Sequence, residues 1–203
     1  MEGEDKVKVL TVVSHPRVES LTFSVTDRFT QGLIDAGHET EVLDLYRSGF
    51  NPVLWEADEP DWSSNHKRYS PDVETEMERM KQNDALAFIF PVWWYHLPAM
   101  LKGYIDRVWN NGFAYGSNKL HHSQVLWLGL AADSKEGIEK RQYLNLMDQQ
   151  LNIAIAGYCG ILNSRVEILY NTLDSNPETH DRLLAQAYHL GLNYDHRQVE
   201  ALS

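Results

Sequence analysis

The chain has 203 residues, of which 43% are hydrophobic, and it contains 6 Phe, 6 Trp and 10 Tyr. This length predicts a single domain over residues 1–203, and so many apolar side chains exclude overall intrinsic disorder. The net charge is −11, and a negative surface repels nucleic acid and anionic lipid. We therefore expect no nucleic-acid partner, and polar tails at about 1–5 and 195–203.

Cysteine usage and hydropathy indicate the compartment. The one cysteine, Cys159, has no partner for an intramolecular disulfide, so we expect it to be a small buried apolar side chain. The first residues lack the basic and apolar regions of a signal peptide. The longest apolar block, 86–95, is about half of the ~20 residues that a membrane-spanning helix needs. We predict a cytoplasmic protein without membrane insertion.

Short runs of branched apolar residues alternate with amphipathic stretches along the whole chain. The runs predict strands at 7–13, 41–45, 85–90, 125–130 and 164–169. The stretches predict helices at 21–36, 72–82, from Pro98 to about 109, 136–158 and 177–192. Strands that alternate with helices form parallel βαβ units. We therefore predict an α/β three-layer sandwich with a five-stranded parallel sheet in the order 2-1-3-4-5.

Ligands of such a sheet bind beyond the carboxyl ends of the strands, where the strand order reverses. The loop after the first strand reads SHPRVESLT over 14–22 and has no glycine-rich phosphate motif. His15, Arg17, Ser20 and Thr22 precede or begin a helix, whose free N–H groups favour an anion. The alternative is that Ser20 only caps the helix and Arg17 is a solvated charge.

The loop after the third strand reads FPVWWYHLP over 90–98. Its three consecutive aromatic residues, Trp93, Trp94 and Tyr95, cannot all point inward, so at least one should face a cleft and stack on a flat cofactor. The alternative is that they cover the end of the sheet or form a subunit contact. Because the third strand ends in Phe90-Pro91 rather than an acidic residue, a phospho-receiver function is not expected.

Other candidate residues carry weaker signals. Tyr115 lies in a glycine-flanked turn at 110–116, where its hydroxyl would bind a substrate carbonyl or simply pack. The adjacent His121 and His122 are expected at the surface. We find no metal-binding constellation and no nucleophile elbow.

The run FPVWWYHLPAMLKGYIDRVW at 90–109, GFAYG at 112–116 and SHP with SLT in the first loop together resemble a known family. They are similar to the NAD(P)H:quinone oxidoreductase branch of the flavodoxin-like flavoproteins over about 7–195, with a weaker match at 158–160. This resemblance implies a flavodoxin-like fold, a bound flavin, NAD(P)H as donor and a quinone or similar acceptor. It also implies a homodimer with sites between the subunits.

The resemblance assigns roles to particular residues. The flavin phosphate and ribityl chain would be held by His15, Ser20, Leu21 and Thr22, and the isoalloxazine lined by Pro91, Val92, Trp94 and Tyr95. Tyr115 would lie on the side of the flavin ring where the substrate binds. Where the family often has Thr-Thr-Gly-Gly, this chain has Leu130, Ala131 and Ala132, which leaves only backbone contacts.

The family's proton-relay Tyr/His pair aligns with Lys135 and Arg141, and a cation such as Arg141 would stabilise a reduced flavin anion. We favour FMN slightly over FAD because the loop after 113–116 is short, as in bacterial members. The irregular segment 46–70, with Trp55 and Trp62, would help to wall the site.

The predicted function is ping-pong hydride transfer from NAD(P)H through the flavin to a quinone-like acceptor. Two alternatives remain open: a flavodoxin-type electron carrier, and a regulatory subunit that binds a potassium-efflux system in the membrane, as some relatives do.

Overall fold

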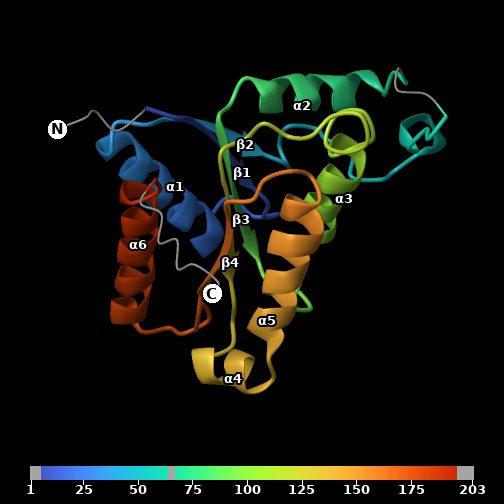
Figure 1. Cartoon of the computed structure of the whole chain (residues 1–203). Coiled ribbons are helices and arrows are strands. Elements are labelled where there is room, and N and C mark those ends of the chain that lie inside the picture. Colours follow the sequence, from blue (N-terminus) through green and yellow to red (C-terminus); the bar gives the residue numbers. More distant parts are fainter. Residues whose placement is uncertain (1–5, 64–66, 196–203) are drawn as a thin grey trace, which may run out of the picture.

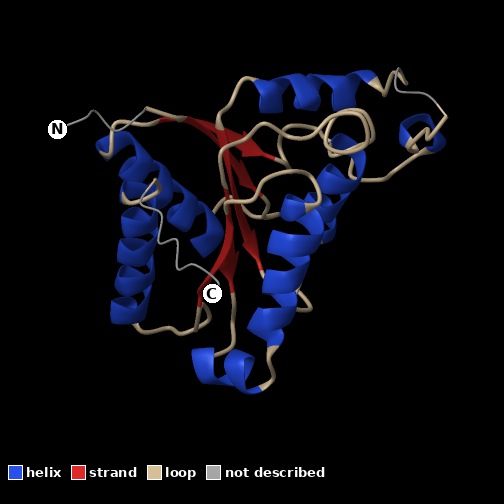
Figure 2. Cartoon of the chain, in the orientation of Figure 1, coloured by secondary structure: helices blue, strands red, loops and turns tan. Residues whose placement is uncertain are grey.

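The computed structural model describes residues 6–63 and 67–195. Five parallel strands form one sheet in the order β2-β1-β3-β4-β5 (Figure 2), which confirms the predicted flavodoxin-like topology. The strands are β1 (Lys8–Val13), β2 (Glu39–Asp44), β3 (Ala85–Pro91), β4 (Val125–Leu130) and β5 (Ser164–Leu169). Of the expected polar tails at 1–5 and 195–203, only Asp195 lies within the described residues.

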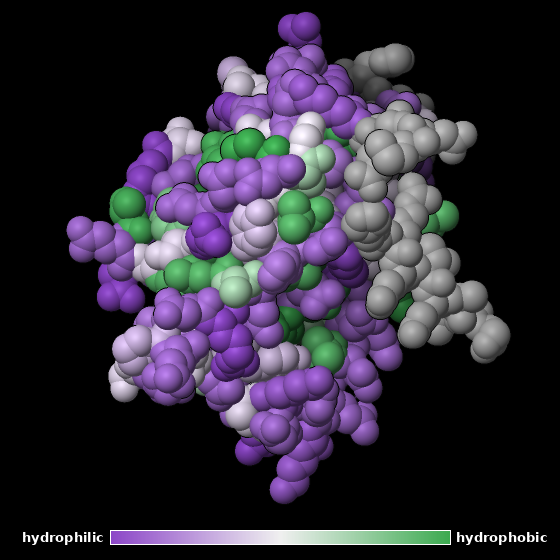
Figure 3. Space-filling model, turned by 90° about the vertical axis from the view of Figure 1, so that its left-hand side faces the viewer, coloured by the Kyte–Doolittle hydropathy of each residue, from purple (hydrophilic) through white to green (hydrophobic). Residues whose placement is uncertain are grey.

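Helices cover both faces of the sheet (Figure 1), as a three-layer sandwich requires. One face is covered by α1 (Leu21–Asp35) and α6 (Pro177–Leu192), whose outer surface is mostly hydrophilic (Figure 3). The other face carries α2 (Pro71–Lys81), α3 (Ala99–Val108) and the α5 region. No described helix is long and apolar enough to cross a membrane.

The core divides into two apolar clusters because side chains of each strand alternate between the two faces. In β3, Leu86, Phe88 and Phe90 enter the cluster beneath α2 and α3, whereas Ala85, Ala87 and Ile89 face α1 and α6. Phe88 stacks on Trp127 of β4, with ring centroids 4.6 Å apart. Cys159 is a buried free thiol in the first cluster, as expected.

The predicted helix at 136–158 is wrong as a single element. The structure has α4 (Lys135–Lys140), α5 (Tyr143–Asp148) and the π-helix η2 (Gln149–Gly157). The break occurs at Gln142, whose φ of 58° lies in the left-handed region and cannot continue a right-handed helix. The second strand also begins two residues earlier than predicted, because Glu39 N–H already bonds the carbonyl of Val7.

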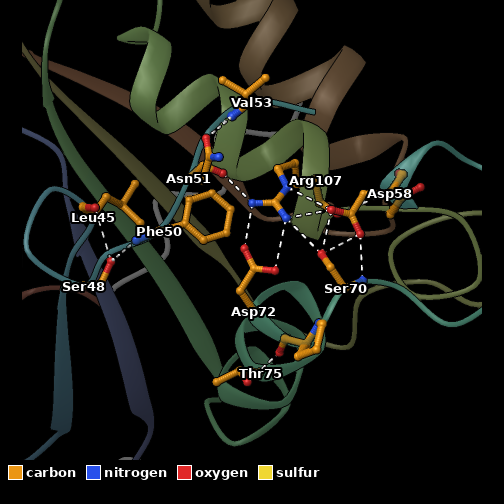
Figure 4. A network of polar contacts seen from close by, with 12 residues as sticks. Leu45, Ser48, Phe50, Asn51, Val53, Asp58, Ser70, Asp72, Thr75 and Arg107 are labelled. Atoms are coloured by element: carbon orange, nitrogen blue, oxygen red, sulfur yellow. Dashed lines mark hydrogen bonds and ion pairs between the residues drawn. The ribbon is translucent and has the colours of Figure 1, made fainter. Parts of the chain in front are cut away.

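The segment 46–70 is tied to the body of the protein by a buried ion pair (Figure 4). The Arg107 side chain on α3 is 4% exposed and its Nη2 lies 2.6 Å from Asp58 Oδ2, a carboxylate that is 1% exposed. Arg107 also bonds Asp72 and the Asn51 carbonyl, and Ser70 donates to Asp58. We call these five residues the Arg107 network.

The charge of Asp58 follows from this arrangement. Burial alone disfavours the carboxylate and raises its pKa, but the hydrogen bonds from Ser70 and from Arg107 outweigh burial. The pKa of Asp58 therefore lies below its ordinary value, and both members of the pair are charged at neutral pH.

The expectation that both His121 and His122 lie at the surface is wrong for the second. His121 is exposed, whereas His122 is buried and donates its Nε2–H to the carbonyl of Met80, at 2.9 Å. Its Nδ1 is buried without a hydrogen-bond partner among the described atoms. Burial penalises the imidazolium, so the pKa of His122 is lowered to about 4.

This burial predicts an acid-dependent loss of stability. The unfolded chain protonates His122 near its ordinary pKa and the folded protein does so only near 4, so stability is lost as the pH falls through this window. His122→Gln keeps an N–H donor for Met80 without the titration. Between pH 7 and 5 we expect the wild type to lose about 2 kcal/mol more than this variant in urea unfolding. If the free energy of unfolding falls equally with pH in the two proteins, His122 is not the group responsible for the loss.

Candidate active site

A pocket of about 410 Å³ lies at the carboxyl ends of β1, β3, β4 and β5, where the strand order reverses. It is lined by residues from four loops: His15, Pro16, Arg17, Ser20, Leu21, Thr22, Pro91, Val92, Trp93, Leu130, Ala132, Thr172 and Leu173. The structure thus brings together the three loops that the sequence indicated. The fourth, after β5, was missed because its sequence carries no recognisable motif.

The first loop provides hydroxyl groups and free N–H groups for an anion. Ser20 is the N-cap of α1, but its side chain makes no capping bond, and no acidic residue occupies the first helical turn. The Ser14 and Ser20 hydroxyls are buried without partners among the described atoms. A buried hydroxyl without a partner is costly, and a ligand oxygen at this helix N-terminus would satisfy the Ser20 hydroxyl, which belongs to the pocket lining. These residues fit a phosphate group.

His15 adds a further polar group. Its Nδ1 lies 3.1 Å from the backbone N–H of Arg17 and 3.0 Å from the Arg17 carbonyl, so this nitrogen is engaged by the backbone of the loop. His15 is buried at the pocket, and its Nε2 is the ring nitrogen that remains for a ligand. Arg17 is exposed at the same loop.

Sequence reasoning missed Arg47, which holds this loop in place. Its guanidinium donates to the carbonyls of His15 (3.2 Å) and Pro16 (2.7 Å) and pairs with Asp44 at 3.0 Å. It also lies over the ring of Phe23, 5.3 Å from the centroid. Only the β1–β2 pairing brings residues so distant in sequence together, so no local pattern predicted the contact.

The aromatic loop forms a tight turn in which Trp93 and His96 exchange backbone hydrogen bonds. The two central residues, Trp94 and Tyr95, have φ values of 55° and 57°. Glycine or asparagine usually occupies such positions, because other L-residues lose about 1–2 kcal/mol in the left-handed region. Trp93 lines the pocket, whereas Trp94 is 93% exposed and Tyr95 packs on Tyr143.

The loop after β4 meets the pocket through two of its three predicted residues. Leu130 and Ala132 line it, whereas Ala131 is buried. The Ala131 N–H donates to the carbonyl of Leu169, and its carbonyl accepts from Thr172. The backbone of Ala131 is therefore already used in the sheet, which leaves Ala132 as the backbone group open to a ligand.

The sequence model of a family with a flavodoxin-like fold matches residues 7–190 of this chain. The chain is 40% identical to YcaK of Escherichia coli, an uncharacterised NAD(P)H oxidoreductase, over 96% of this chain and 98% of the relative. The solved NAD(P)H:quinone oxidoreductase from Methanothermobacter marburgensis superposes with a TM-score of 0.87 at 30% identity, covering 96% of this chain and all of that one. This chain belongs to the flavodoxin-like NAD(P)H:quinone oxidoreductase family.

The protein is therefore an oxidoreductase. A shorter match, 30% identical, joins 53% of this chain to 45% of NAD(P)H dehydrogenase [quinone] 1 of Cavia porcellus.

Arg141 and Tyr115 are the two residues that the sequence predicts to act in catalysis. Only Arg141 lies near the pocket. Arg141 follows α4, 3.6 Å from Asp133, at the same edge of the sheet. Tyr115 lies at the opposite edge, because α3 runs back along the sheet and the loop 109–124 leads into the start of β4.

Tyr115 is packed against other aromatic rings at that edge. Its ring lies 5.7 Å from that of Trp62 and 5.6 Å from that of Tyr158. Burial, followed by the neighbouring Tyr158 and Cys159, raises the pKa of Tyr115. Tyr115 thus carries its proton at neutral pH and does not line the pocket of its own chain.

No group of three or more His, Cys, Asp or Glu residues in the described part of the chain is arranged to hold a metal ion.

Proposed function

We propose that this protein is a flavin-dependent NAD(P)H:quinone oxidoreductase that passes two electrons to a quinone-like acceptor by a ping-pong mechanism. The observation that carries the proposal is the unpartnered hydroxyl of Ser20 at the N-terminus of α1, in a pocket whose wall includes Trp93. A flavin has the complementary parts, a phosphate and a flat ring. We favour FMN slightly over FAD.

Each part of the pocket has a task in this proposal. The α1 N-terminus, the Ser20 hydroxyl and His15 Nε2 hold the phosphate. Pro91, Val92 and Trp93 provide apolar surface against the ring and exclude water. The bound flavin supplies hydride chemistry, and the protein positions donor and acceptor in turn on one open side. Arg141 provides positive charge at this edge, which favours a reduced, anionic ligand.

We further propose a homodimer. Large apolar side chains are exposed on the α5 side, among them Leu146, Ile153, Tyr158 and Leu162, which are 55–89% exposed. A second copy covering this surface would also explain the position of Tyr115, since Tyr115 of the partner subunit would complete the substrate side. Light scattering should then give twice the 23.4 kDa of one chain.

The decisive experiment is spectroscopic. The purified protein is incubated with FMN or FAD, desalted, and mixed with NADPH or NADH without oxygen, and 1,4-benzoquinone is then added. We expect retained absorption at about 450 nm that bleaches with nicotinamide and returns with quinone. Flavin that is retained but not reduced would instead indicate an electron carrier. If neither flavin is retained, the proposal fails.

A further inference from the structure

Backbone strain in the described residues is concentrated at the edge of the sheet that holds the pocket. Four non-glycine residues have positive φ: Trp94, Tyr95, Gln142 and Asn171. They lie in the connections that follow β3, β4 and β5, all at the carboxyl ends of the strands. Such strain persists only where surrounding contacts impose it, and it gathers at functional sites.

A ring stack joins two of these strained connections. The rings of Tyr95, in the aromatic turn, and Tyr143, the first residue of α5, lie 3.6 Å apart between centroids at 27°. Tyr143 directly follows Gln142, so the left-handed backbone of Gln142 sets the position from which the Tyr143 side chain leaves the chain. The two tyrosines are 48 positions apart, and both are half-buried.

The position of α5 does not depend on this stack, because other contacts fix it. Met147 of α5 and Ile138 of α4 are 2% and 1% exposed in the core, and the Ser134 side chain caps α4. The aromatic turn differs, because it holds two bulky residues in the left-handed region while Trp94 projects into solvent. The stack therefore stabilises the turn more than it stabilises the helix.

We propose that Tyr143 is a positioning residue for the flavin site: it holds Tyr95, and through Tyr95 the strained turn that presents Trp93 to the pocket. The inference rests on the proposed function. The contact that carries the role is the stack of the two rings.

The test compares Tyr143→Ala with Tyr143→Phe, using FMN as the probe and flavin fluorescence to measure its Kd. Loss of the ring should raise the Kd about tenfold and change the shape of the bound FMN absorption band, whereas Phe, which keeps the ring, should bind within about twofold of wild type. Tyr143→Leu serves as a second variant that keeps apolar contact in α5 if the alanine variant unfolds.

Two controls separate positioning from general stability. If Tyr143 acts through Tyr95, the double variant Y95A/Y143A should bind FMN no more weakly than Y95A alone. Tyr188→Ala removes a tyrosine of α6 that bonds Asp35 on α1, so it should lower thermal stability without changing the Kd.

The outcomes are distinct. A wild-type protein that binds FMN, with alanine and leucine variants that bind it equally well, overturns the role of Tyr143 alone. Additive losses in the double variant also overturn it. A wild-type protein that binds neither flavin removes the proposed function itself, and the inference with it.

Discussion

Replacement of Arg107 by methionine is expected to lower the free energy of unfolding by about 3–5 kcal/mol. The substitution leaves the Asp58 carboxylate, 1% exposed, without its main counter-charge, while Ser70 alone still donates to it. An uncompensated buried charge costs far more than the net contribution of the intact pair. Urea unfolding of the apoprotein, followed by far-UV circular dichroism, measures the difference.

Lys102→Met is the matched control for this prediction. Lys102 lies on the same helix and pairs with Asp106, but both side chains are about 40% exposed, at 39% and 42%. An exposed pair of this kind contributes roughly 0.5 kcal/mol or less. The double variant R107M/D58N removes both charges and should recover part of the loss. If R107M is within about 1 kcal/mol of wild type, the Arg107 network does not hold the segment 46–70.

Ser20→Asp should weaken FMN binding about 100-fold while the fold becomes no less stable. Aspartate is a favoured N-cap, and its charge suits the N-terminus of α1. The same charge occupies the place proposed for the flavin phosphate and repels it. FMN binding should therefore weaken without a loss of stability, which distinguishes damage to the site from unfolding of the protein.

Ser24→Asp introduces the same charge one helical turn further on, at an exposed position outside the residues that line the pocket. It should change the Kd for FMN by less than about threefold in physiological salt. Equal losses in the two variants would mean that the phosphate is not held at the start of α1, and the flavin would then have to lie elsewhere along the sheet edge.

The sequence predicted the sheet well because its three central strands, β1, β3 and β4, are short, apolar runs buried on both faces. A run such as ALAFIF has one stable environment, between two helical layers. The helix at 136–158 was misjudged for the opposite reason. Its break at Gln142 is neither glycine nor proline, so composition carries no signal of the left-handed backbone. His122 was misjudged because burial depends on its contact with Met80, 42 positions away.

The site was predictable wherever it depends on strand ends. Carboxyl ends of parallel strands meet at one edge, so the loops 14–22 and 90–98 had to converge. The contacts that shape those loops were not predictable. Arg47 reaches the first loop across the β1–β2 pairing, and Tyr143 reaches the third across a helix break.

The network around Arg107 extends to the edge that carries Tyr115. The Asn110 side-chain amide donates to the Asp58 carbonyl at 2.7 Å, and the Tyr69 hydroxyl donates to the carbonyl of Asn111 at 2.7 Å. These bonds fix the turn beneath Tyr115 during folding of the single chain. A partner that docks there, a second copy included, meets a surface that is already ordered, so less conformational entropy is lost on association.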